Sequence, residues 1–234
     1  MEDLKDFHVV TVYKKGQRVY HEGQVAEIPA PKLPEHLEAA ALNTFHLPRL
    51  TPAMFANSRP RGVIGMIPGQ IVTQDMGYAN AVDTEKDILK MAVIERHKNT
   101  GHIGIGYLSG YGLTEGAVAT SVSHDSHNII CVGANDEDMA LAANRIAENH
   151  GGIVVVKHGE ILAELPLEIA GLMSNKPLTV VNDLLEKAKD AAYTLGVGKD
   201  IDPFMTLSFM SLPVIPTLRL TTRGVVDVMT QQYI

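Results

Sequence analysis

Apolar runs with the length of one β-strand recur along most of this chain, and no other feature limits its possible folds as strongly. A short run that is apolar throughout is typical of a strand in the middle of a sheet, and residues 128–132 form such a run. The pattern of residues 87–97 fits either a strand or a helix. The runs in this part of the chain that we expect to form strands cover residues 62–73, 87–97, 102–108, 117–122, 128–132, 153–156 and 160–164, and a last strand-like stretch covers 224–229.

Two segments with helical periodicity interrupt these strands. The first begins after Asn135, which can cap a helix, and three acidic residues follow it where the positive end of the helix dipole favours them. Its apolar residues recur at helical spacing, and Gly151 and Gly152 end it. The second covers roughly residues 179–195. Strands with few helices predict an α/β or α+β fold, in which a mixed β-sheet carries packed helices.

The N-terminal part of the chain has a different sequence pattern from the rest, with alternating side chains followed by frequent prolines. Residues 7–13 and 18–25 alternate apolar and polar side chains, which predicts a β-hairpin with Gly16 in its turn. Prolines then punctuate the chain up to position 60, around one short helical stretch at 35–42. We therefore expect three parts, in order along the chain: a hairpin at 1–30, a proline-rich connector at 31–60 and a mixed α and β domain at 61–234.

The composition excludes several classes of protein. A net charge of −7 is opposite in sign to the basic surface that a nucleic-acid-binding protein needs. The single cysteine, Cys131, rules out an intramolecular disulfide and a zinc site built from several cysteines, and it fits a reducing cytoplasm. No apolar run has the length of a signal peptide core or a membrane span. We expect a cytoplasmic protein with neither nucleic acid nor membrane as a partner.

The densest polar cluster lies at residues 121–128, between two predicted strands. Two histidines and a carboxylate, His124, Asp125 and His127, can bind a metal, relay a proton or hydrogen-bond a heteroaromatic substrate. The alternative is a structural turn in which Asp125 and Asn128 cap local main-chain groups. Spacing alone slightly favours the turn.

Three other features have simpler interpretations. The charged residues 95–98 follow a predicted strand and are typical of a solvated strand end, although a loop position leaves a role in a site open. The glycines between positions 101 and 116 indicate tight turns and close sheet packing rather than a ligand site. Cys131 lies in an apolar run, which predicts a buried residue rather than a nucleophile.

Five stretches of the chain, in the same order, are similar to the C-terminal region of the adenine deaminases of the amidohydrolase superfamily. The N-terminal hairpin also resembles the closing strands of the small β-sandwich domain in that family, of which it would be a remnant. The five matching stretches are residues 96–104, 116–129, 132–139, 165–174 and 202–209.

The resemblance implies the hydrolysis of adenine to hypoxanthine and ammonia in purine salvage. It also implies a pair of divalent metal ions, manganese or iron, held by a barrel domain that carries a His-x-His motif. That motif is absent from this sequence, so we expect no metal to be bound by this chain alone. We expect the chain to be the C-terminal part of such an enzyme, inactive by itself, that works with the barrel in cis or in trans as a homo-oligomer.

The resemblance raises the polar cluster to the leading candidate site. His124, Asp125 and His127 are the candidate catalytic residues, in a loop over the active site, and Ser126 and Asn128 are weaker candidates for contacts to adenine. Two alternatives stay open. The chain is either a structural or assembly module without catalytic residues, or a domain that binds a small ligand through the loop histidines beside a separate catalytic chain.

Overall fold

The computed structural model describes residues 5–27 and 32–234, and the chain divides into two compact units, Met1–Glu38 and Ala39–Ile234. The first unit contains a three-stranded antiparallel sheet of β1 (Thr11–Lys14), β2 (Gln17–His21) and β3 (Gln24–Val25). The predicted hairpin is therefore confirmed for β1 and β2. Its turn places Gly16 at φ +78°, a conformation that glycine adopts without steric cost.

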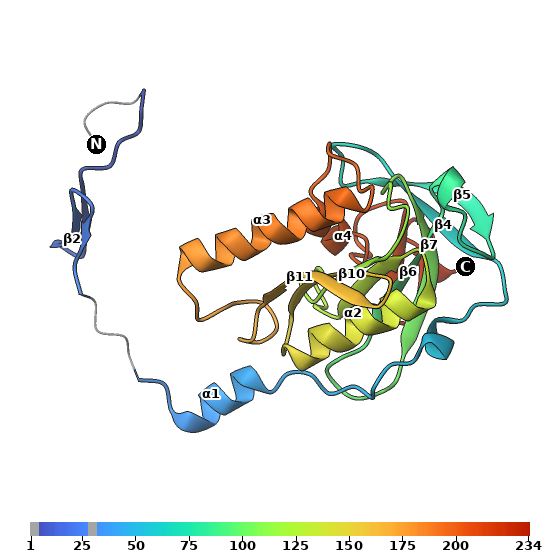
Figure 1. Cartoon of the computed structure of the whole chain (residues 1–234), viewed down its shortest axis with the longest axis horizontal. Helices are drawn as coiled ribbons and strands as arrows, with labels where there is room; N and C mark the ends of the chain where they lie inside the picture. The colour runs from blue at the N-terminus through green and yellow to red at the C-terminus, as the bar shows by residue number, and fades with distance from the viewer. Residues whose placement is uncertain (1–4, 28–31) are drawn as a thin grey trace. The chain divides into compact units, whose positions relative to one another are not determined.

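The second unit is built on one mixed eight-stranded sheet, in the order β11-β10-β8-β9-β6-β7-β4-β5 (Figure 1). All neighbouring strands are antiparallel except β4 and β7, which are parallel. The apolar run at 128–132 forms β9 in the middle of this sheet, as predicted. The strands are β4 (Arg61–Met66), β5 (Thr73–Ala79), β6 (Leu89–Ile94), β7 (Ile103–Ser109), β8 (Ala117–Thr120), β9 (Ile129–Gly133), β10 (Gly152–Lys157) and β11 (Glu160–Pro166).

The prediction of one strand across residues 62–73 is wrong. The strand β4 ends at Met66, and a turn follows in which the main-chain N–H of Gln70 donates to the carbonyl of Ile67 at 3.0 Å. The chain then reverses into β5, an edge strand that the sequence did not predict. Its large apolar side chains Met76 and Tyr78 are more than half exposed, so β5 has no buried face that would give an apolar pattern.

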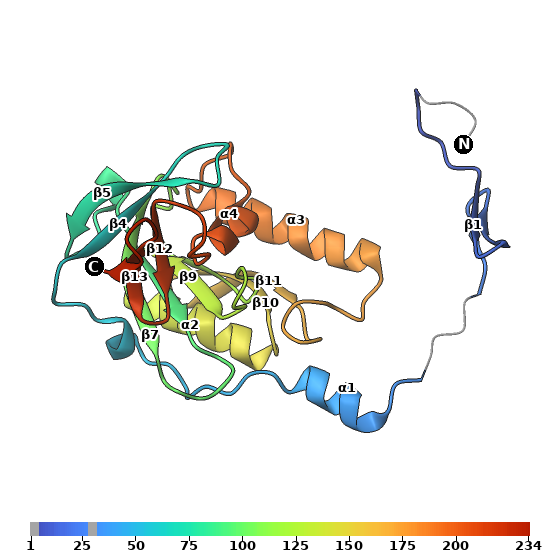
Figure 2. The same ribbon diagram turned by 180° about the vertical axis from the view of Figure 1, so that it is seen from behind.

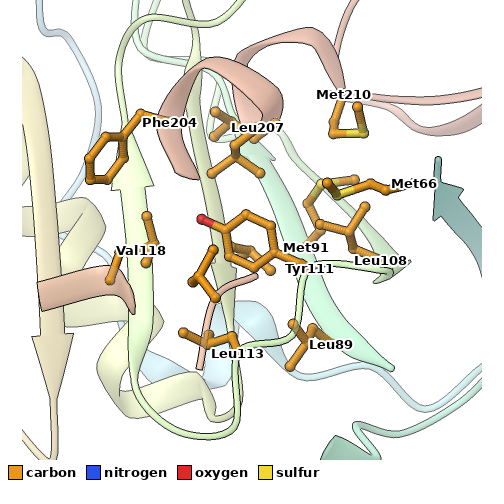
Figure 3. Close-up of a cluster of buried hydrophobic side chains, with 14 of the residues drawn as sticks. Met66, Leu89, Met91, Leu108, Tyr111, Leu113, Val118, Phe204, Leu207 and Met210 are labelled. Atoms are coloured by element: carbon orange, nitrogen blue, oxygen red, sulfur yellow. The ribbon is translucent and has the colours of Figure 1, made fainter. Parts of the chain in front are cut away.

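Helices cover both faces of the sheet (Figures 1 and 2). Helix α2 (Asp136–Glu148) packs on β8, β9 and β10, and helix α3 (Leu178–Thr194) packs on β10 and β11. Alternate residues of a strand enter different cores: Met91 lies in the core on the α3 side, and its neighbour Ala92 lies in the core on the α2 side. Figure 3 shows the α3-side core beneath α4, where Tyr111 lies among leucine and methionine side chains. The mixed α+β fold is as predicted.

The C-terminal segment completes this second unit. Asp202 caps helix α4 (Pro203–Phe209), and a small antiparallel sheet follows, of β12 (Leu218–Thr221), β13 (Gly224–Asp227) and β14 (Gln232–Tyr233). The sequence predicted a strand only near β13. Leu218, Leu220 and Val225 of this sheet join the α3-side core.

Along the chain, two helices come between β3 and β4: helix α1 (Glu35–Leu42), which has the predicted bounds, and the 3-10 helix η1 (Pro52–Phe55). Leu50 and Phe55 are buried in the α2-side core, so this part of the proline-rich segment packs into the second unit. A second 3-10 helix, η2 (Thr84–Lys86), precedes β6. In the described part of the chain, none of the helices combines the length and apolar character needed to span a membrane.

Candidate functional site

The histidine loop, residues 121–128, joins β8 to β9 and contains all five candidate site residues. These strands pair antiparallel up to Thr120 and Ile130, so both ends of the loop are fixed by the sheet. Inside the loop the main-chain N–H of His127 donates to the carbonyl of Ser123 at 2.6 Å. Asp125 and Ser126 are exposed at its tip, and the two histidines are half-buried.

Helix α4 and the residues that follow it hold one side of the loop. The main-chain N–H of His124 donates to the carbonyl of Ser208 at 2.9 Å, and Ser211 Oγ donates to the carbonyl of His124 at 3.2 Å. The imidazole of His124 lies 4.8 Å from the ring of Phe209 between centroids. Main chain and side chain of His124 are therefore both tied to the end of α4.

Arg96 holds the other side of the loop, although the charged residues around it predicted a solvated strand end. That prediction is wrong for Arg96, whose exposed fraction is 1%. Its Nε donates to the carbonyl of His127, its Nη1 to the carbonyl of Thr44 at 2.9 Å and its Nη2 to the carbonyl of Ala170 at 3.0 Å. The ring of Phe45 lies 4.2 Å from the guanidinium carbon. Burial lowers the pKa of Arg96 to about 10, so it stays charged at neutral pH.

The exposed residue that follows Arg96 forms a second contact with the loop. His97 Nε2 donates to the carbonyl of Ser126 at 2.8 Å. The carboxylate of Glu95 accepts hydrogen bonds from the main-chain N–H groups of His97, Lys98 and Thr100. Partial burial alone would raise the pKa of Glu95, but hydrogen bonds from Thr100 and His97 outweigh it and lower the pKa. The turn that presents His97 to the loop is thus itself ordered by hydrogen bonds.

The surroundings of His127 favour its neutral form. Burial lowers the pKa of the His127 imidazole, and the neighbouring His124 and Arg96 lower it further, while Asp125 opposes them. Its Nδ1 is buried and has no hydrogen-bond partner among the described residues. The His124 and His127 rings lie 5.9 Å apart between centroids. A neutral imidazole can accept a proton near neutral pH, as a general base requires.

A cavity of about 490 Å³ lies beside the loop. Asp125, Ser126 and Asn128 line it, whereas the two histidines are not among its lining residues. Asn128 also holds the turn, since its Oδ1 accepts from the main-chain N–H of Arg96 at 3.4 Å. Asp125 makes no hydrogen bond to other described residues. The other lining residues are Val93, Ser211, Leu212, Pro213, Val214, Thr221 and Thr222.

The loop does not form a metal centre by itself. Within residues 5–27 and 32–234, three or more histidine, cysteine, aspartate or glutamate side chains nowhere gather in a group that could hold a metal ion. The metal pair that the resemblance implies therefore does not fit the described residues of this chain. Cys131 is fully buried, and burial raises the pKa of its thiol well above the usual range, which disfavours the thiolate.

A family model and the curated relatives both relate this chain to adenine deaminases. The family model described as "Adenine deaminase C-terminal domain" matches residues 70–232. An adenine deaminase of Brucella abortus is 49% identical over 196 residues, which cover 80% of this chain and 34% of the relative. Adenine deaminase 2 of Carboxydothermus hydrogenoformans is 43% identical over 239 residues, which cover 98% of this chain and 41% of the relative. An adenine deaminase of Nitratidesulfovibrio vulgaris is 42% identical over 240 residues, with the same two shares.

The chain thus spans between 34% and 41% of the length of these relatives. The matched region contains β5 to β13, and with them the histidine loop, Arg96 and α4. On the strength of a family match over more than half its length, the chain belongs to the family of adenine deaminase C-terminal domains.

Proposed function

We propose that this chain is the C-terminal part of an adenine deaminase, a hydrolase that converts adenine and water to hypoxanthine and ammonia in purine salvage. The observation that carries this proposal is the family match over residues 70–232, together with relatives named adenine deaminase at 42–49% identity. In this reaction water adds to the purine carbon that bears the amine, and a ring nitrogen takes up a proton. The bond from carbon to the amine then breaks, and ammonia leaves.

Each of these steps moves a proton, and we assign that work to the histidine loop. His127 is favoured as a neutral imidazole, so it can accept a proton and return it near neutral pH. His124 and Asp125 are the other candidates for proton transfer. Ser126 and Asn128 line the adjacent cavity and can hydrogen-bond the nitrogen atoms of a purine. The support for these roles is that strands, α4 and Arg96 fix the loop before any ligand binds.

The remaining parts of the proposal concern the rest of the enzyme. A manganese or iron pair would be held by the part of the family protein that lies beyond the match to this chain, in a barrel joined in cis or supplied in trans. Such a pair supplies an activated water molecule. We further propose a cytoplasmic homo-oligomer, with adenine as the substrate.

The cavity beside the loop favours one second candidate, a domain that binds a small ligand without taking part in proton transfer. The lining of the cavity combines polar residues with Val93, Leu212, Pro213 and Val214, which suits a small heteroaromatic molecule. In that case adenine or a related purine would bind to the isolated chain, and the loop histidines would be dispensable for turnover.

Ammonia release from adenine tests the proposed function. The complete enzyme, meaning this chain together with the barrel region, should release ammonia in the presence of manganese. The purified chain alone should release none, because its described residues gather no metal-binding group that could activate water. Manganese-stimulated turnover by the chain alone would contradict this division of labour, and a complete enzyme that leaves adenine unchanged would contradict the assigned reaction.

A further inference from the structure

One buried side chain joins three segments that are far apart in the sequence. The guanidinium of Arg96 donates to main-chain carbonyls at Thr44 after α1, at His127 in the histidine loop and at Ala170 between β11 and α3. One further hydrogen bond joins two of these regions again, since Ser121 Oγ donates to the carbonyl of Gly171 at 2.6 Å. The guanidinium of Arg96 and the hydroxyl of Ser121 thus hydrogen-bond the histidine loop to the segments around Thr44 and Ala170.

The chemistry of this junction requires an arginine. A guanidinium presents five N–H donors in a planar fork, so it can bind several carbonyls in different directions at once. Arg96 forms no ion pair with another described residue, and a buried charge without a counter-ion costs stability unless hydrogen bonds satisfy it. A lysine would keep the charge but would lose both the fork and the planar stacking on Phe45.

The contact bears directly on the proposed proton-transfer residue. The carbonyl that accepts from Arg96 Nε belongs to His127 itself, and His127 has a φ of +49°. That left-handed conformation is unfavourable for residues other than glycine and persists only where the surroundings fix it. Arg96 supplies one such contact, and the bond from His97 to the carbonyl of Ser126 supplies another.

We propose that Arg96 is a positioning residue for adenine deamination, which holds the His127 imidazole in its working orientation through the main-chain carbonyl of His127. His97 assists by fixing the preceding peptide. The inference rests on the proposed function of the histidine loop and goes beyond it, because Arg96 acts without touching the purine.

The chain offers a matched control in Arg219. Arg219 is fully buried and donates to the main-chain carbonyls of Ile71, Pro216 and Leu218, as Arg96 does to those of three other residues. Burial lowers the pKa of Arg219 to about 10, as it does for Arg96. None of these carbonyls belongs to the histidine loop. Replacing either arginine with lysine therefore removes a similar set of buried hydrogen bonds, but only one replacement releases the loop.

The test compares Arg96→Lys with Arg219→Lys in the complete enzyme, and records thermal stability, kcat and KM. Both variants should lose thermal stability. Only Arg96→Lys should lower kcat, by up to about 10²-fold, with a much smaller change in KM, because misplacing a reacting group by 1 Å can cost that factor. His97→Ala removes an exposed contact, so it should fold normally and lower kcat by a smaller factor. Equal kcat values for Arg96→Lys and wild type, with His127→Ala inactive, would overturn the inference.

An NMR measurement tests the positioning of His127 independently of the proposed deaminase activity. The imidazole signals of His127 in the NMR spectrum of the chain should shift in Arg96→Lys and His97→Ala and stay in place in Arg219→Lys. If His127→Ala keeps full turnover, the proposed role of the loop fails, and the NMR signals alone decide whether Arg96 positions His127. Unchanged His127 signals in folded Arg96→Lys would overturn the inference even if the role of the loop stands.

Discussion

Two buried arginines show how single residues organise the second unit. Neither Arg96 nor Arg219 forms an ion pair with another described residue, and each uses its planar fork to bind carbonyls from separate segments. Both keep a pKa of about 10 despite burial, so both remain charged through the neutral range. Because Arg96 is charged, protonation of the neighbouring His127 imidazole is unfavourable in the folded chain.

We predict that protonation of His127 destabilises the folded chain. Its pKa is lowered in the folded state, first by burial and then by His124 and Arg96, so the unfolded chain binds its proton more readily. Stability contributed by His127 is therefore fully present above the unfolded pKa of about 6.5 and declines as pH falls through the folded value. Urea unfolding between pH 7 and pH 5 measures the effect. His127→Gln should reduce this decline, and an unchanged pH dependence in that variant would contradict the prediction.

We predict that Cys131 is chemically inert in the folded chain. It is fully buried with a raised thiol pKa, and its Sγ lies 3.8 Å from the carbonyl of Met139. A thiol reagent should label it slowly under native conditions and rapidly in denaturant. Cys131→Ser should cost about 1–3 kcal/mol of stability, because a hydroxyl replaces an apolar thiol in the core. Fast labelling of the native chain would contradict the burial.

At the scale of elements, the start of α2 links a helix to a hairpin. Asn135 Oδ1 accepts from the main-chain N–H of Asp138 at 2.7 Å, which caps the helix. The buried carboxylate of Asp138 in turn accepts from the main-chain N–H groups of His158 and Gly159, at 3.0 and 2.8 Å, in the turn between β10 and β11. One helix turn thus fixes the geometry of a neighbouring hairpin.

We predict that Asn135→Ala lowers the free energy of unfolding by about 1 kcal/mol, the usual cost of losing a helix cap. Asp138→Ala keeps the main-chain N–H that Asn135 caps, but it should cost more, because it leaves two main-chain donors of the hairpin turn without partners. Glu137→Ala, at an exposed position of the same helix turn, serves as the control and should change stability by less than either. Denaturant unfolding of the three variants decides the order, and a smaller loss for Asp138→Ala than for Asn135→Ala would be the contrary result.

Local signals decided which elements could be predicted from the sequence. Helix α2 has a cap, acidic residues in its first turn and four fully buried apolar residues at helical spacing, and these local features predict it from the sequence, as apolar runs predict β10 and β11. Strands β5 and β12 were missed. β5 has exposed apolar side chains at a sheet edge, and β12 packs through long-range contacts that no local pattern records. Helix α4 is too short for a clear periodicity.

The candidate site was predictable only in part, for a related reason. The cluster 121–128 is contiguous, so its composition marked the loop directly in the sequence. Arg96 lies in a charged run that is typical of solvent exposure, and its burial depends on Thr44, His127 and Ala170, which come from three distant segments. Arg96 is the first residue of the matching stretch 96–104, and that resemblance was the only sequence signal that distinguished it from its charged neighbours.

At the scale of the whole molecule, the histidine loop, Arg96, α4 and the cavity all lie in the second unit and within the residues that the family model matches. The loop connects two strands in the middle of the sheet, β8 and β9. Hydrogen bonds to its main chain come from α4 on one side and from Arg96 on the other. Such support from several elements is expected of a site whose side chains must be in place before the substrate arrives. The decisive question is whether the loop histidines take part in the chemistry.

The most direct measurement is the kcat for adenine deamination by complete enzymes that carry His124→Ala or His127→Ala, with thermal stability recorded in parallel. Removal of a general acid or base should lower kcat by about 10²-fold or more while the stability changes little. His102→Ala, an exposed histidine outside the loop, is the matched control and should keep the turnover of wild type. If both loop variants keep full turnover, or lose it only because they unfold, the loop is structural and the assignment is wrong.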